Sequence, residues 1–157
     1  MKIRLILIGK TTNQHLISLC DDYASRLSHY APFNIDILPA VSQTRNLTQA
    51  QQAIAEGKTL LAQIRPTERL ILLDEHGKSL SSQTFADWLN SSLLASHSSL
   101  TFAIGGPYGF SPQVYARAND LLSLSHMTFS HQMVRLIFLE QLYRAFTILK
   151  GQPYHHT

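Results

Sequence analysis

Strand-like and helix-like patterns of apolar residues alternate along the whole chain. Apolar side chains that recur every three or four positions, as in Gln14–Leu27, are typical of a helix with one buried face. Short apolar or alternating runs that end at turn residues are typical of strands. The pattern predicts strands over 3–8, 33–37, 69–73, 100–104 and 121–124, and helices over Gln14–Leu27, 47–64, 81–96, 112–118 and 132–150. This alternation predicts an α/β fold, a mostly parallel sheet flanked by helices, in a single domain over residues 1–157.

The last predicted helix is apolar on nearly all of its sides. Such a helix needs burial on more than one face. Because the domain is small, we expect the second face to pack against another subunit. Gly151 is interpreted as the stop of this helix. Tyr154 and His155 follow it, too late in the chain to be expected to contribute much core.

Composition narrows the class of protein. The chain has 157 residues, of which 45% are hydrophobic and 15% are charged, which fits one compact domain and excludes a disordered protein. No run approaches the roughly 18 apolar residues of a membrane span, and the first apolar run contains Arg4 and is expected to be a strand rather than a signal peptide. Cys20 is the single cysteine, so no internal disulfide is possible, and we expect it on a helix face of a cytoplasmic protein. The net charge of +3 permits a polyanionic partner without requiring one.

Two adjacent glycines follow the fourth predicted strand, in the segment Ile104-Gly105-Gly106-Pro107-Tyr108-Gly109-Phe110. Ser111 and Pro112 come next, a pair that is typical of a helix start. Glycines at a strand-to-helix turn let the backbone approach a ligand without an intervening side chain. In a dinucleotide-binding fold this turn would follow the first strand as G-x-G-x-x-G, but here a single glycine, Gly9, follows that strand. The sequence therefore predicts a cofactor site in the C-terminal part of the chain, and not an ordinary Rossmann site.

Three predicted loops lie at the carboxyl ends of strands: residues 73–78, 105–109 and 125–131. Residues 74–78 are interpreted as a turn. Ligands of open α/β sheets bind outside the carboxyl ends of the strands, so the three loops are expected to converge on one pocket. The alternative for each loop is a simple connecting turn.

Longer motifs carry a family resemblance. The segments LLDEHGK, IGGPYGFS, LSLSHMTFSHQMVRLIFLEQLYRAFTIL and the tail PYHH strongly resemble the RlmH-type methyltransferases of the SPOUT superfamily, over essentially the whole chain. The resemblance implies a C-terminal deep trefoil knot, S-adenosylmethionine as cofactor and a homodimer built on the knot helices. It also implies a substrate, a pseudouridine in a stem-loop of large-subunit ribosomal RNA, methylated at N3.

The resemblance also assigns a cofactor site without a metal. The implied cofactor contacts are Leu73, Gly105, Leu124, Ser125, His126, Met127, Thr128 and Phe129. They fall in the three loops already singled out. The alternative for the apolar members is ordinary core packing.

Candidate catalytic residues follow from the chemistry of the implied reaction. A neutral imide N–H is a poor nucleophile, so a base or an anion-stabilising cation is expected near it. His131 is the candidate base, Arg144 could stabilise the anion or bind phosphate, and Arg135 could bind phosphate. Tyr154 and His155 match a family motif that closes over the site. The alternatives are that Glu140 pairs with Arg144 along the helix, and that His131 caps it.

Two other functions remain open. One is a non-catalytic RNA-binding or ribosome-associated module that keeps the fold. The other is a SPOUT methyltransferase that acts on another RNA, such as transfer RNA. Tyr108 stands where relatives often have Glu, so we assign no acidic role to the glycine loop. The low charge favours a large preformed substrate such as the ribosome, which can supply further contacts.

Overall fold

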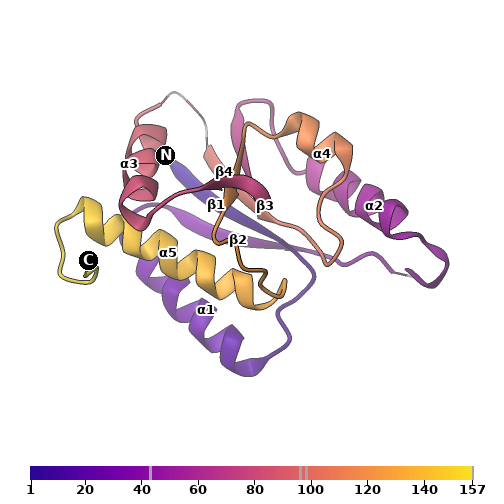
Figure 1. The fold of residues 1–157 in the computed structure, drawn as a ribbon, viewed down its shortest axis with the longest axis horizontal. Coiled ribbons are helices and arrows are strands. Elements are labelled where there is room, and N and C mark those ends of the chain that lie inside the picture. The colour runs from indigo at the N-terminus through magenta and orange to yellow at the C-terminus, as the bar shows by residue number, and fades with distance from the viewer. Residues whose placement is uncertain (43, 96, 98, 157) are drawn as a thin grey trace.

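The structure is a computed structural model and describes residues 1–42, 44–95, 97 and 99–156. Within these residues the centre of the molecule is a parallel sheet with the strand order β2-β1-β4-β3-β5 (Figure 1). The strands are β1 (Lys2–Ile8), β2 (Phe33–Leu38), β3 (Glu68–Ser79), β4 (Ser99–Ile104) and β5 (Asp120–Ser123). The helices are α1 (Gln14–Leu27), α2 (Gln49–Leu61), α3 (Ser82–Leu93), α4 (Pro112–Arg117) and α5 (Met133–Leu149), with a short 3-10 turn at Thr44–Asn46. The predicted α/β fold is confirmed.

Helices cover both faces of the sheet. Helices α1, α3 and α5 lie on one face, and α2 and α4 lie on the other (Figure 1). Side chains of a strand alternate between the faces, so Leu5 of β1 joins the core under α5 while Ile6 joins the core under α2. Cys20 lies on α1, as predicted, and is buried there. None of the helices in the described ranges is both long and apolar enough to cross a membrane.

Side-chain caps that the sequence carries locally fix several helix ends. Thr48 and Gln51 form a capping box, so α2 begins just after Thr48 and not at the predicted residue 47. Ser111 caps α4, as predicted. The third predicted helix ends early, at Leu93, and its predicted last residue, Ser96, lies outside the described residues.

The interpretation of residues 74–78 as a turn is wrong, because β3 continues through them to Ser79. The strand bulges there, since Leu122 of β5 is paired with both Leu73 and Lys78. Gly77 makes the second pairing possible. A Cβ on Gly77 would lie only 2.5 Å from the backbone of β5. The polar stretch after Leu73 is therefore held as extended chain by its neighbour, against its local turn preference.

Helix α5 begins beside β1, far from the strand that precedes it in sequence. Arg135 donates to the carbonyl oxygens of Ile8 and Gly9 at 2.8 and 2.9 Å, and Gln132 bonds to the loop that follows β1. Strands β3 and β4 separate β5 from β1, so residues 124–131 cross the carboxyl ends of both. Arg135 is fully buried, and the expectation that it could bind phosphate is wrong.

Candidate functional site

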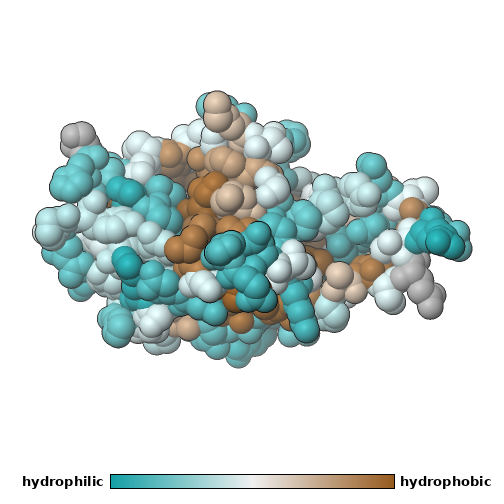
Figure 2. Space-filling view, turned by 90° about the horizontal axis from the view of Figure 1, so that it is seen from below, coloured by the Kyte–Doolittle hydropathy of each residue, from teal (hydrophilic) through white to brown (hydrophobic). Residues whose placement is uncertain are grey.

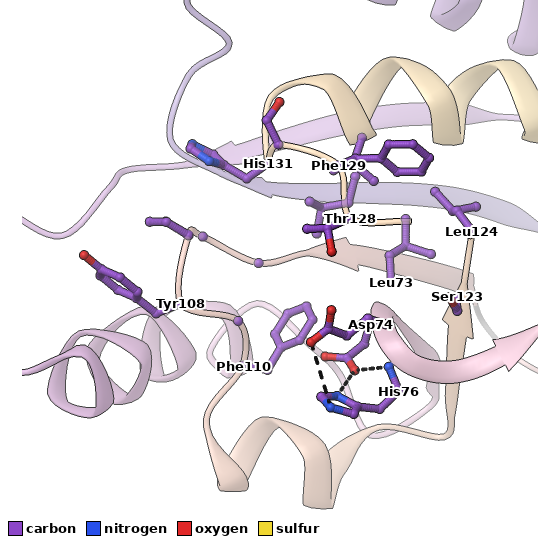
Figure 3. A pocket seen from close by; sticks show the side chains of 18 of the residues that line it. Leu73, Asp74, His76, Tyr108, Phe110, Ser123, Leu124, Thr128, Phe129 and His131 are labelled. Carbon is purple, nitrogen blue, oxygen red and sulfur yellow. Dashed lines mark hydrogen bonds and ion pairs between the residues drawn. The ribbon is translucent and has the colours of Figure 1, made fainter. Parts of the chain in front are cut away.

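A cavity of about 630 Å³ opens at the carboxyl ends of β3, β4 and β5. All three segments predicted to converge there contribute to its wall: the bulged part of β3, the glycine loop after β4, and the segment that crosses to α5 (Figure 3). Cavities of roughly 300–1,000 Å³ are typical of small-molecule sites. The predicted convergence is confirmed, and its size suits a small organic ligand.

The predicted cofactor residues lie in the cavity wall with one exception. Those that line the cavity are Leu73, Gly105, Leu124, Ser125, Met127, Thr128 and Phe129. His126 is exposed and is not among the lining residues. The candidate base His131 does line the cavity. In Figure 3, Leu73 and Leu124 lie toward one side of the cavity, and His131 and Tyr108 lie toward the other.

The glycine loop forms its part of the wall with backbone. The N–H of Gly109 donates to the carbonyl of Gly106 at 3.2 Å, which closes a turn with Pro107 and Tyr108 at its centre. Gly109 has a φ of +74°, a backbone conformation that residues with a side chain rarely adopt. A Cβ on Gly105 would lie 3.3 Å from the carbonyl oxygen of Gly109, a tight contact. The loop therefore needs glycine for its own shape.

Serine side chains hold the crossing segment in its path. The hydroxyl of Ser123 donates to the carbonyl of Ser125 at 2.9 Å, and the hydroxyl of Ser125 accepts from the N–H of Met127 at 2.9 Å. Further on, the hydroxyl of Ser130 accepts from the N–H of Met133 at 3.1 Å. The alternative that His131 caps the last helix is therefore wrong. Its side chain is left to face the cavity.

A polar cluster lies at the rim, around Asp74. The carboxylate accepts a hydrogen bond from the hydroxyl of Tyr115. It also accepts hydrogen bonds from the backbone N–H and the ring Nδ1 of His76, both at 2.8 Å (Figure 3). Burial alone would raise the pKa of Asp74, but the hydrogen bonds from Tyr115 and His76 outweigh it, and the pKa is lowered. Burial and the bond to Asp74 raise the pKa of Tyr115, so its hydroxyl remains a donor. Asp74 is thus an ionised carboxylate that orients its two neighbours.

Sequence reasoning missed Tyr115. It comes from α4 and meets Asp74 across 41 positions of sequence. No local pattern links the two residues. The sequence indicates Tyr115 only indirectly. Because α4 follows the glycine loop, its side chains are expected to lie near the same strand ends.

The remaining candidate catalytic residues form a second cluster, away from the cavity. Arg144 donates to Glu140 at 2.6 Å, which confirms the expected pairing along the helix, and contacts Nδ1 of His155 at 3.1 Å. Tyr154 donates to the same carboxylate oxygen of Glu140 at 3.1 Å. At 1.5 Å per residue, Arg144 lies roughly 17 Å along the axis from the start of α5. Within one chain, Arg144, Tyr154 and His155 are brought together with one another and not with His131.

The tail is docked on the helices. The ring of Tyr154 packs edge-on against Tyr143 with 4.8 Å between centroids, and its hydroxyl is 3.0 Å from that of Tyr23 on α1. Burial and the hydrogen bonds to Tyr23 and Glu140 raise the pKa of Tyr154. Gln152 accepts a hydrogen bond from Tyr30. The tail therefore packs on the surface of α1 and α5, while neither Tyr154 nor His155 joins the buried core, as expected.

Nothing in the described part of the chain offers a metal site. Across residues 1–42, 44–95, 97 and 99–156, no three His, Cys, Asp or Glu side chains group closely enough to hold an ion.

Comparisons with known proteins identify the family of the chain. The family described as "Predicted SPOUT methyltransferase" matches residues 1–155. A protein of Flavobacterium psychrophilum named ribosomal RNA large subunit methyltransferase H is 53% identical over 156 residues, which cover 99% of each chain. Proteins of the same name from Flavobacterium johnsoniae and Bacteroides fragilis are 51% and 47% identical, again over 99% of each chain. The chain therefore belongs to the SPOUT methyltransferase family.

Proposed function

We propose that this chain transfers a methyl group from S-adenosylmethionine to large-subunit ribosomal RNA, at N3 of a pseudouridine in a stem-loop. The observation that carries the proposal is the convergence of three loops on one cavity with a backbone wall at its glycine loop. Membership in a methyltransferase family gives the reaction class, and the names of the relatives point to the same RNA.

The cavity residues fit this cofactor. Leu73, Leu124 and Phe129 offer apolar side chains of the kind that enclose an adenine ring. The turn at Gly105 and Gly106 presents backbone to the remainder of the molecule. When bound, S-adenosylmethionine supplies an electrophilic methyl group on a positively charged sulfur.

His131 is the proposed proton acceptor. The N3 nitrogen must lose its proton before or during attack on the methyl group, and imidazole is the side chain best matched to that task near neutral pH. The carbonyl of His131 accepts a hydrogen bond from the buried Arg135 at 3.1 Å, so its backbone is anchored. The backbone of His131 is therefore held in place at the cavity wall, which His131 lines.

The second cluster gives a reason for a homodimer. Arg144, Tyr154 and His155 lie too far from their own cavity to act there, so we propose that they act at the cavity of a second copy. Figure 2 shows apolar surface gathered across the middle of the face seen from below. Helices α1 and α5, which cover one face of the sheet, also expose apolar side chains, Leu19 at 45% and Met133 at 42%. Exposed apolar surface of this kind is typical of an interface.

The RNA partner is proposed to be the assembled ribosome in the cytoplasm. A chain with a net charge of +3 neutralises few phosphates by itself. A large preformed substrate supplies shape and further contacts, which a free stem-loop does not. The trefoil knot implied by the family remains part of this proposal, formed where residues 124–131 cross the strand ends.

Two measurements test the proposal against its rivals. Titration calorimetry with S-adenosylmethionine should show binding, whereas a non-catalytic RNA-binding module should show none. Mass spectrometry of ribosomal RNA from a strain without the gene should show a pseudouridine that has lost its N3 methyl group, restored when the gene returns. Unchanged ribosomal RNA together with a methyl group missing from transfer RNA would favour a SPOUT enzyme with another target.

A further inference from the structure

A buried carboxylate lies directly behind the glycine loop. Glu56 of α2 is 6% exposed, and its two carboxylate oxygens would lie 2.6 and 2.7 Å from a Cβ placed on Gly106. Gly105 and Gly106 line the 630 Å³ cavity on one side and a small void with Glu56 on the other. The wall between the carboxylate and the cavity is therefore one backbone thick. It can be this thin only because Gly106 has no side chain.

The surroundings of Glu56 do not explain why a carboxylate is there. The void beside it is lined by Ile8, Ala53, Gly57, Leu60, Gly109, Phe110, Ser111 and Val114. Its Oε1 atom is buried and accepts no hydrogen bond from any described residue. Burial raises the pKa of Glu56, and a hydrogen bond from Gln52 on the same helix offsets this in part. A buried acid without a cationic partner costs stability, so the absent partner is the informative feature.

The carboxylates on the cavity side of this wall are either hydrogen-bonded or exposed to water. Asp74 already accepts bonds from Tyr115 and His76, and Glu75 is 68% exposed, so water screens its charge. The titratable groups that face the cavity are Asp74, Glu75, His76 and His131, together with Tyr108 and Tyr115. None of them is a buried negative charge without a partner.

We propose that Glu56 is a positioning residue that supplies, through the Gly105–Gly106 backbone, the negative counter-charge for the cationic methyl donor. This rests on the proposed function, since it takes the cavity ligand to be S-adenosylmethionine. Glu56 does not touch the reacting atoms. It makes the site prefer the positively charged sulfur of the donor over the neutral sulfur of the product, S-adenosylhomocysteine, and so favours product release after transfer.

The expected size follows from the thickness of the wall. A ligand charge on the far side of one backbone lies about 8 Å from the carboxylate, and at an effective dielectric constant of about 20–40 this attraction amounts to a factor of about five to thirty in affinity. We expect about tenfold. The two ligands differ only in the methyl group and the charge that it confers, so their ratio isolates this effect from packing.

The test is titration calorimetry with both ligands on the wild-type chain, on Glu56→Gln and on Asp87→Asn. The Gln side chain keeps the shape of Glu56 and removes its charge. Asp87 is an exposed carboxylate on α3, across the sheet, so its substitution makes the same change in net charge elsewhere. We expect Glu56→Gln to weaken S-adenosylmethionine about tenfold, leave S-adenosylhomocysteine within about twofold, and leave the melting temperature unchanged or higher. Asp87→Asn should keep the wild-type ratio.

A pH series on the wild-type chain and on Glu56→Gln gives a second readout. The preference of the wild-type chain for S-adenosylmethionine should rise with pH as Glu56 ionises, and this rise should be absent from Glu56→Gln. All other groups around the cavity are the same in both proteins, so the difference between them reports Glu56. An equal loss for both ligands, or no loss for either, overturns the inference while the proposed function stands. Failure of the wild-type chain to bind either ligand overturns both.

Discussion

Replacement of Arg135 tests how the last helix is held against the sheet. Its guanidinium donates to the carbonyls of Ile8, Gly9 and His131 at 2.8, 2.9 and 3.1 Å, and to the hydroxyl of Thr11 at 2.9 Å. Burial lowers the pKa of Arg135, but an arginine remains charged in this setting. Three of these charge-assisted bonds join the end of β1 and the loop after it to α5, and the fourth, to His131, lies at the start of α5 itself. Arg135→Met fills the same space and removes all of them.

The cost follows from the groups left without a donor. Each buried carbonyl that loses its donor lowers the free energy of unfolding by about 1–3 kcal/mol. Removing the buried charge also removes its desolvation penalty, which offsets part of this loss. For all the bonds together we expect Arg135→Met to lower the free energy of unfolding by about 3–5 kcal/mol. In a domain of this size each kcal/mol lowers the melting temperature by about 2–4 °C, which predicts a fall of about 10–15 °C. Arg135→Lys keeps the charge with fewer donors, and we expect a smaller fall.

The assay is thermal or urea unfolding, with Arg26→Met as the matched control. Arg26 is a surface arginine on α1 that pairs with Asp22 four residues away and lies over the rings of Tyr23 and Tyr143, and its loss should cost much less than the loss of Arg135. A melting temperature of Arg135→Met within about 2 °C of wild type, together with a large loss of RNA affinity, would refute the reasoning. It would show that Arg135 binds phosphate after all.

Three further predictions concern the strand bulge, the tail and the assembly. Gly77→Ala should lower the free energy of unfolding by about 1–3 kcal/mol, because the new Cβ would lie 2.5 Å from the backbone of β5. The new Cβ of Gly151→Ala would have no atom within 4 Å, so this variant should lose only about 1 kcal/mol, all of it from the positive φ. Equal melting temperatures of the two variants would contradict this. Tyr154→Phe should keep the ring packing against Tyr143 and unfold close to wild type, while Tyr154→Ala should unfold about 2–4 kcal/mol more easily; equal effects of the two variants would show that the tail does not rest on its ring. Light scattering at micromolar concentration should give twice the chain mass of 17.7 kDa, and a monomeric mass would exclude the dimer.

The sequence predicted the elements whose signals are local. Gln14–Leu27 was predictable to the residue, because its apolar stripe and its cap at Asn13 are both written in that segment. Ser111 and Pro112 likewise predicted where α4 starts. Residues 74–78 have the polar and glycine composition of a turn, yet they are extended, because pairing with β5 decides their conformation and that pairing is not visible locally.

The site was predictable to the level of its loops. Parallel topology brings the carboxyl ends of strands together, so the convergence followed from the order of elements. The contacts of individual polar side chains could not be predicted from the order of elements. Arg135 and Arg144 lie on the same apolar helix, but the first is fully buried under β1 and the second joins the tail at Glu140 and His155. Periodicity places both residues on the helix and cannot say which neighbour each of them meets.

The apolar last helix shows the same limit. Its all-round apolar character predicted a second subunit, but α1 and α3 both pack against it within the chain, and residues such as Phe138 and Leu142 are buried without any partner. Contacts within the chain therefore already bury part of the apolar surface of α5 that had suggested a dimer. What remains is the exposed apolar surface beside α5 and the distance from Arg144 to the cavity, and only the second gives the dimer a chemical purpose. The oligomer is therefore better argued from where the catalytic candidates lie than from the apolar residues that first suggested it.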